Sequence, residues 1–174
     1  MAKLRKFAAY RRLERPYTRL SKYRNKNYVR GSPHIVISQF DMGNRTKKFP
    51  FSLRLISRES LQIRQNAIES ARMVCNRTLE TKIGKENYRF IIKTYPYHIL
   101  RENPLAAGAG ADRMSTGMQR SFGKVIGRAA QVRTGKELML VQCNKEMLDI
   151  AKDALRKARS RLPKSCKIEM TESK

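Results

Sequence analysis

The sequence predicts an α+β fold in which two helices cover one face of a mostly antiparallel or mixed sheet, giving two layers. One observation is a strand–helix–strand unit across residues 34–95, and a second is the same order repeated across 137–170. Apolar residues that alternate are typical of strands, and apolar residues three or four positions apart are typical of helices. A third observation separates residues 1–33, which are too basic and too poor in apolar residues to form a core. We therefore expect a basic N-terminal arm followed by one domain across 34–174.

The first unit opens with two segments that we expect to be strands. Residues 34–40 are rich in β-branched and aromatic side chains, and the turn residues 41–45 follow them. In the next segment, polar residues alternate with the apolar residues Phe49, Phe51, Leu53 and Leu55. Pro50 has no N–H to donate to a ladder, so we expect this second strand at an edge of the sheet.

A helix is expected from Arg58 to Glu80. Ser57 suits the N-cap, and Glu59 suits the first turn, where the helix dipole favours a negative charge. One face of this helix would carry the apolar residues Leu61, Ile68, Ala71, Val74, Cys75 and Leu79. Gly84 and Asn87 then mark a turn, and residues 88–95 read as the next strand.

The second unit repeats these patterns. We expect a strand at residues 137–143. Asn144 then caps a second helix, which carries Glu146 in its first turn. Its apolar stripe consists of Met147, Leu148, Ala151, Ala154, Leu155, Ala158 and Leu162. Pro163 ends the helix, and alternation from Cys166 to Met170 indicates a last strand.

Between the units lies a glycine-rich segment, about 104–127, with almost no periodicity. Long irregular stretches inside a domain usually have a function. Its basic residues are Arg113, Arg120 and Lys124, with Arg128 just beyond, against the single acid Asp112. Gly108 and Gly110 allow the backbone to approach a phosphate or a base closely.

Charge is the strongest indication of function. The chain of 174 residues has 39 Lys and Arg against 14 Asp and Glu, a net charge of +25. Self-repulsion of that size favours a polyanionic partner. A membrane partner would call for a basic amphipathic helix or a lipid anchor, and we find no CaaX-like end and no Met-Gly start. No segment reaches the ~20 apolar residues of a membrane span. Three cysteines without CxxC spacing favour a reducing cytoplasm.

The arm has the composition of an RNA-binding segment. Its aromatic residues include Tyr17 and Tyr28, which can stack on unpaired bases, while its cations bind phosphate. Only Glu14 opposes its basic side chains, which are Lys3, Arg5, Lys6, Arg11, Arg12, Arg15, Arg19, Lys22, Arg24, Lys26 and Arg30. Charge spread over arm, loop and second helix indicates contact with a large folded RNA.

Other chemistries find little support in the residues. Residues 108–113 match only part of a GxGxxG nucleotide-binding pattern, since Arg113 replaces the third glycine. His34 and His98 stand alone, so we expect no metal, and no nucleophile or acid–base pair is recognisable. We therefore expect no cofactor and no enzyme. An RNA-modifying enzyme and an architectural nucleic-acid-binding protein remain the alternatives.

Several motifs resemble one ribosomal protein family. Residues 28–33, 40–43 and 96–103 match it in this order, and the strongest match is 109–118 followed by 122–124. The chain is similar to large-subunit ribosomal protein ten-e, the archaeal and eukaryotic counterpart of bacterial large-subunit protein sixteen. The likeness extends from the arm to about Met170, and the short C-terminal end resembles archaeal members.

The resemblance implies a structural protein of the large ribosomal subunit in the cytoplasm. It implies rRNA, tRNA and neighbouring ribosomal proteins as partners, no membrane and no homo-oligomer. The fold it implies is a two-layer α+β domain with a hammerhead-like β extension. Its internal loop would face the bound tRNAs and help shape the peptidyl-transferase region through Leu105, Gly108, Gly110, Asp112, Arg113, Met114 and Gly117.

The resemblance also adds candidate rRNA contacts outside the arm, namely Arg101, Asn103, Arg113, Arg120, Lys124 and Arg128. The chain departs from the family at Gln119, where members often have arginine. A phosphate contact at that position would then depend on Arg120.

Overall fold

The computed structural model describes residues 5–14, 21–27, 29, 31–103, 117–163 and 165–172. Within them, five strands form one sheet in which every neighbouring pair is antiparallel. In spatial order these strands are β1 (Asp41–Gly43), β4 (Tyr88–Ile92), β7 (Glu137–Cys143), β2 (Phe51–Ser57) and β8 (Cys166–Glu172). The α+β fold class is confirmed.

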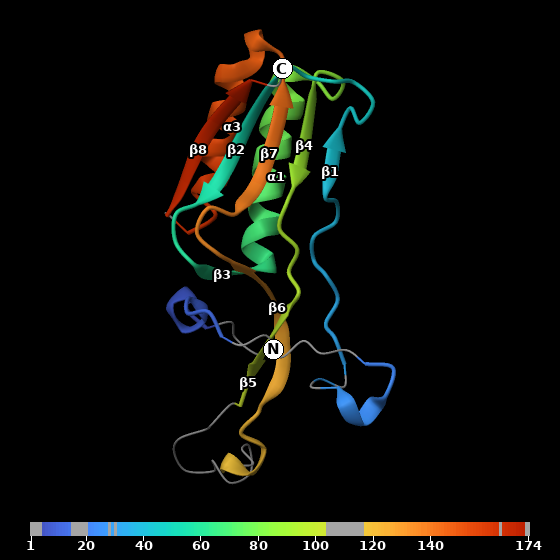
Figure 1. The fold of residues 1–174 in the computed structure, drawn as a ribbon, viewed down its shortest axis with the longest axis vertical. Helices are drawn as coiled ribbons and strands as arrows, with labels where there is room; N and C mark the ends of the chain where they lie inside the picture. Colours follow the sequence, from blue (N-terminus) through green and yellow to red (C-terminus); the bar gives the residue numbers. More distant parts are fainter. Residues whose placement is uncertain are drawn as a thin grey trace.

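Two helices, α1 (Gln65–Ile83) and α3 (Leu148–Arg159), cover one face of this sheet (Figure 1). Leu53, Phe90 and Val141 from the strands are fully buried against Cys75 and Leu155 of the helices. We call this unit the body. It contains most of the apolar core and corresponds to the two layers that the sequence predicts.

A second antiparallel sheet extends from one end of the body (Figure 1). It consists of β3 (Leu61–Arg64), β6 (Lys124–Val132) and β5 (His98–Glu102). We call this sheet the extension. It confirms the β extension that the family resemblance implies, although no periodicity in 98–102 or 124–132 predicts its strands.

Backbone hydrogen bonds fix the connecting segments to the body where the chain passes between the two sheets. The N–H of Ser57 donates to the carbonyl of Lys136 (3.0 Å), and the N–H of Gly135 donates back to Ser57 (2.8 Å). Lys93 N–H donates to the Leu138 carbonyl (2.9 Å). Short 3-10 turns complete the described chain: η1 (Phe7–Tyr10), η2 (Arg24–Lys26), η3 (Gly117–Arg120) and η4 (Lys145–Met147).

The first helix begins later than predicted, at Gln65 rather than Arg58, and Ser57 ends β2 instead of capping it. Leu61 lies in β3, where it pairs with Val132. Leu61 precedes Ile68 by seven residues, or two helical turns, so the spacing of apolar residues fits a helix as well as a strand.

The predicted strand across 34–40 is wrong, because these residues have no strand neighbour in the described chain. Isolated bonds hold this extended segment: Val36 N–H donates to Gln65 Oε1 (3.3 Å), and Ile92 N–H donates to the Phe40 carbonyl (2.8 Å). The strand begins instead at Asp41, where the sequence predicts a turn.

Strand β2 is not an edge strand, since it lies between β7 and β8. Pro50 precedes the first residue of β2, so the ladder never requires its missing N–H.

The second unit is closer to expectation. Strand β7 has the predicted bounds, and Ala151, Ala154, Leu155 and Ala158 form the buried face of α3. Asn144 precedes the 3-10 turn η4, and its side chain makes no capping hydrogen bond.

Candidate nucleic-acid interface

Residues 5–14 of the arm lie on the extension, and the sheet holds them by their main chain. Gln62 Nε2 donates to the carbonyl of Arg12 (2.5 Å), and Gln131 Nε2 donates to that of Glu14 (2.7 Å). Gln62 and Gln131 are partners across β3 and β6, so both point from the same face. Arg64 Nη1 adds a third bond, to the carbonyl of Arg5 (2.9 Å). The path of the arm is therefore set by the extension.

Two predicted RNA-binding arginines of this stretch already have acidic partners. Arg5 forms an ion pair with Glu102 of β5, and Arg11 forms one with Glu59 (2.9 Å). The Arg11 pair is exposed on both sides, and such pairs contribute little in water. These two arginines orient the arm on the extension, while Lys6 and Arg12 are exposed beside them.

The second described stretch of the arm presents cations without a supporting sheet. Lys22, Arg24 and Lys26 are exposed around the turn η2. The ammonium of Lys26 lies 5.1 Å from the centre of the exposed Tyr23 ring. A basic group beside an exposed aromatic ring fits phosphate and an unpaired base together. This stretch is the described part of the arm best suited to RNA.

At the far end of the extension, predicted RNA contacts stabilise the protein itself. The guanidinium carbon of Arg101 lies 3.6 Å from the centre of the Phe122 ring, and Nη1 donates to the Phe122 carbonyl (3.1 Å). Asn103 Nδ2 donates to the carbonyl of Gly117 (3.0 Å), the first residue of η3. Lys124 is exposed at the start of β6.

Arg128 of β6 holds the chain that follows the arm. Its Nε donates to the Pro33 carbonyl (2.7 Å), and its Nη2 contacts Ser32 Oγ. Arg128 therefore has a structural role inside the chain, a role that the sequence does not predict.

Several predicted contacts lie outside what the structure describes. They are Lys3, Arg15, Tyr17, Arg19, Tyr28, Arg30 and Arg113, the side chain of Arg120, and the loop residues Leu105, Gly108, Gly110, Asp112 and Met114. Their roles stay predictions.

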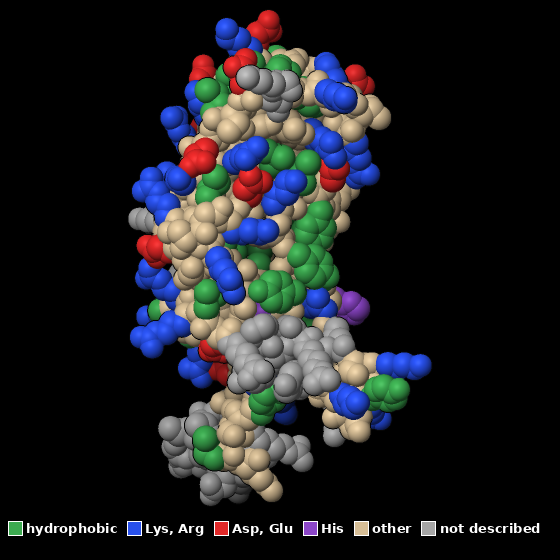
Figure 2. Space-filling model, in the orientation of Figure 1, with side chains coloured by type: hydrophobic (Ala, Val, Ile, Leu, Met, Phe, Trp, Pro, Cys, Tyr) green, Lys and Arg blue, Asp and Glu red, His purple; other side chains and the backbone are tan. Residues whose placement is uncertain are grey.

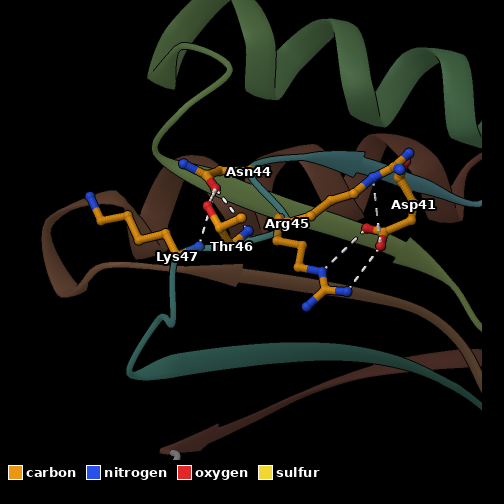
Figure 3. Close-up of polar contacts among 6 residues, drawn as sticks. Asp41, Asn44, Arg45, Thr46 and Lys47 are labelled. Carbon is orange, nitrogen blue, oxygen red and sulfur yellow. Dashed lines mark hydrogen bonds and ion pairs between the residues drawn. The ribbon is translucent and has the colours of Figure 1, made fainter.

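The structure adds a basic turn that the sequence does not single out, between β1 and β2. Asn44 Oδ1 accepts hydrogen bonds from the N–H groups of Thr46 (3.0 Å) and Lys47 (3.1 Å) (Figure 3). Arg45 Nη2 donates to the Asp41 carbonyl (3.0 Å). The turn exposes Arg45, Lys47 and Lys48 at the end of the body away from β5 (Figure 1). Their closeness in sequence is the signal by which this basic turn could have been found.

Charges elsewhere on the body are mixed in sign. Figure 2 shows Lys and Arg side chains interspersed with Asp and Glu over the upper part of the molecule. Arg54 pairs with Glu137 (3.0 Å), and Lys157 pairs with Asp153 (3.0 Å). The arm and the basic turn, where cations are less balanced, are therefore the better candidates for a polyanion.

The titratable groups of the described chain show no catalytic arrangement. Cys75, Cys143 and Cys166 are buried and free, and burial raises the pKa of each thiol, to about 11 for Cys143 and Cys166. Burial lowers the pKa of His98, which keeps its imidazole neutral. Among the described residues, no three His, Cys, Asp or Glu side chains gather as metal ligands, and no helix is long and apolar enough to cross a membrane.

Comparisons with known proteins agree on one family. Residues 15–169 match the family model described as ribosomal protein L16p/L10e. A large ribosomal subunit protein uL16 from Archaeoglobus fulgidus is 46% identical across 91% of this chain and 88% of its own length. Proteins of the same name from Methanococcus maripaludis and Nanoarchaeum equitans are each 43% identical, covering 98% and 100% of this chain and 96% of their own lengths.

Proposed function

Because the chain belongs to the ribosomal protein L16p/L10e family, we propose that it is a structural constituent of the large ribosomal subunit that binds rRNA in the cytoplasm and catalyses no reaction. The observation that carries this proposal is the arm, whose backbone the extension holds while its cations stay exposed. Neighbouring ribosomal proteins are its other partners, and no second copy of the chain is required.

Binding is electrostatic and geometric. The net charge of +25 attracts the rRNA, and each phosphate neutralised releases a counterion, which makes the affinity depend on salt. Lys22, Arg24 and Lys26 provide phosphate contacts in the described arm, while Tyr23 provides a stacking surface. The basic turn at 44–48 gives the body a second, separate contact.

Salt-dependent sedimentation tests rRNA binding. The full chain should comigrate with the large subunit at moderately high salt. A triple variant, Lys22→Gln, Arg24→Gln and Lys26→Gln, removes three cations, so the slope of log affinity against log salt should fall by about 2 to 3.

The matched control for this variant exchanges the charges, as Lys22→Arg, Arg24→Lys and Lys26→Arg, and should keep the slope. A chain that stays at the top of the gradient, or a neutral variant with the wild-type slope, would contradict the proposed role of the arm.

The segment 105–117 is proposed to face tRNA and support its binding. The proposal depends on the family resemblance and on the sequence of a segment that lies, apart from Gly117, outside the described residues. Deleting residues 105–117 should leave rRNA docking largely intact and impair tRNA binding or translation. Normal translation by subunits that contain the shortened chain would remove this role.

A further inference from the structure

Two tyrosines are exposed where the body meets the extension, on residues 93–97 between β4 and β5. Burial alternates along this segment: Lys93, Tyr95 and Tyr97 are exposed, whereas the residues between them are buried. Tyr95 is 50% exposed and Tyr97 is 41% exposed. Figure 2 shows hydrophobic side chains gathered at this junction, with Lys and Arg side chains at their borders. Large exposed rings that lie this close together indicate a binding surface.

Contacts inside the chain hold both rings in place. The Tyr95 ring stacks on Phe40, with ring centres 5.7 Å apart and planes 26° apart. The Tyr97 hydroxyl donates to Gln131 Oε1 (3.2 Å). The N–H of Tyr97 donates to the Tyr95 carbonyl (3.0 Å), which makes a tight turn centred on Pro96 and keeps the two tyrosines close. Rings that are already fixed lose little conformational entropy when a ligand binds, so this surface is prepared to receive one.

The charges beside the rings favour an anionic group at one end of the segment. Lys93 has no acidic partner among the described residues, and the bond from its N–H to the Leu138 carbonyl (2.9 Å) fixes its main chain. Tyr97, in contrast, lies near the arm through Gln131, whose Nε2 donates to the Glu14 carbonyl (2.7 Å). The exposed carboxylate of Glu14 would repel a phosphate. We therefore expect phosphate near Lys93 and bases over the rings.

A protein partner fits this surface less well than a nucleic acid does. The cores of protein interfaces are depleted of lysine, yet Lys93 is exposed only two positions before Tyr95. The net charge of +25 also favours a polyanion. A nucleotide provides a flat aromatic face for a ring and a phosphate for the cation. Stacking on aromatic side chains is a common way in which proteins bind unpaired RNA bases.

We propose that one unpaired base of the bound rRNA stacks on Tyr95, that the adjacent nucleotide lies against Tyr97, and that Lys93 binds the phosphate beside them. Every base has a π face, so this site selects an unpaired strand rather than a sequence. Phe40 and Gln131 act through the two tyrosines, because they hold the rings in position. This inference deepens the proposed rRNA binding and rests on it.

The experiment compares large subunits that carry the full chain as wild type or as single variants. Tyr95→Leu and Tyr97→Leu keep an apolar side chain and remove the ring, whereas the matched control Tyr95→Phe keeps the ring. Met73→Leu changes an exposed apolar residue of α1 and controls for assembly. The rRNA is treated with a reagent that acylates flexible 2′-hydroxyl groups. The content of this chain and of the other ribosomal proteins is measured in each particle.

The expected result is a nucleotide that reacts weakly in particles with the wild-type, Tyr95→Phe or Met73→Leu chain. Its reactivity should rise about fivefold or more in Tyr95→Leu, because a fivefold change corresponds to ~1 kcal/mol, the lower end for stacking of one base. Tyr97→Leu should raise the reactivity of the adjacent nucleotide. Particles that contain every variant at the wild-type level, with no nucleotide changed, would overturn the inference. Loss of another ribosomal protein in Tyr95→Leu, with unchanged rRNA, would also overturn it and assign the surface to a protein.

Failure of the proposed function would look different, because the wild-type chain would then be missing from the subunit. In that case the isolated full chain is titrated with the dinucleotide adenylyl-adenosine and with ribose 5-phosphate, and the ring resonances of Tyr95 and Tyr97 are followed. Upfield shifts with the dinucleotide, but not with the sugar phosphate, would still support stacking, since a stacked base shields the tyrosine protons. No shift with the dinucleotide would end the inference.

Discussion

The body and the extension are both antiparallel β structure, yet different interactions stabilise them. In the body, Phe90 and Val141 pack against two helices in an apolar core without exposed surface. In the extension, one face binds the arm through Gln62 and Gln131, and a polar cavity separates the two. The difference indicates that the body is held by hydrophobic burial, whereas the extension combines buried apolar residues, Leu61, Ile63, Ala130 and Val132, with polar contacts to the arm.

The largest expected effect comes from deleting one aromatic ring in each region. Phe90→Ala leaves a cavity in the body and should lower the free energy of unfolding by about 3 to 5 kcal/mol. Phe122→Ala removes a half-exposed ring and its contact with Arg101, and should cost about 1 kcal/mol. Urea denaturation followed by circular dichroism measures both, and equal losses would remove the distinction between the regions.

A smaller effect is expected at two glycines that share a positive φ. At Gly43 (φ +85°), an added Cβ would lie 2.2 Å from the Tyr88 carbonyl oxygen, whereas Gly135 (φ +81°) has open space. Gly135→Ala carries only backbone strain, about 1 to 2 kcal/mol, and Gly43→Ala adds the clash, for a total of about 3 kcal/mol. Thermal unfolding of the two variants compares them. A Gly43→Ala variant as stable as Gly135→Ala would mean that β1 and β4 separate easily.

The third prediction concerns the attachment of the arm. Gln62→Leu removes the bond to the Arg12 carbonyl, worth about 1 kcal/mol, so trypsin should cleave after Arg12 about fivefold faster. Gln142→Leu makes the same change in the body, where Gln142 Nε2 donates to Ser52 Oγ (3.4 Å), and should leave this cleavage unchanged. Equal cleavage rates in both variants would show that side chains of the arm, not its carbonyls, hold it.

The smallest effect is a difference in response to acid. Burial lowers the pKa of His98 in the extension below 6.5, and the hydrogen bond from Arg72 lowers that of Glu69 in α1 below 4.5. Both groups bind fewer protons when folded, so each contributes full stability above its unfolded pKa and loses it as pH falls through its folded pKa. Amide protection in β5, which is exchange relative to the intrinsic rate at the same pH, should therefore decrease below about pH 6.5, before protection in α1 decreases below about pH 4.5. The variant His98→Leu should lack the first change.

The sequence is most informative where one short pattern has one interpretation. The short apolar segment 137–143 predicts β7 with its bounds, and helical spacing predicts the buried face of α3. Leu61 fits two patterns, and its partner Val132 lies 71 positions away, so the pairing that decides for a strand is not visible locally. Residues 34–40 show the opposite case: their local pattern is typical of a strand, yet they form none in the described chain. A segment becomes a strand only where a neighbouring strand offers a free edge.

The candidate site was predictable in charge but not in geometry. The basic composition of the arm indicates RNA, and Lys22, Arg24 and Lys26 are exposed as that function requires. The sequence does not show that Arg128 holds Pro33 or that Arg5 meets Glu102, because both contacts join residues almost a hundred positions apart. It also gives no sign of the cavity, which forms only when the arm lies on the extension.

The attachment of the arm by its carbonyls has a consequence for how this protein can evolve. Every residue type supplies the same carbonyl, so the bonds from Gln62, Arg64 and Gln131 hold whichever side chains the arm carries. Substitutions there can accumulate, or be engineered, without displacing the main chain. The side chains of the arm can therefore change to bind a different RNA, while the hydrogen bonds to its main chain stay the same.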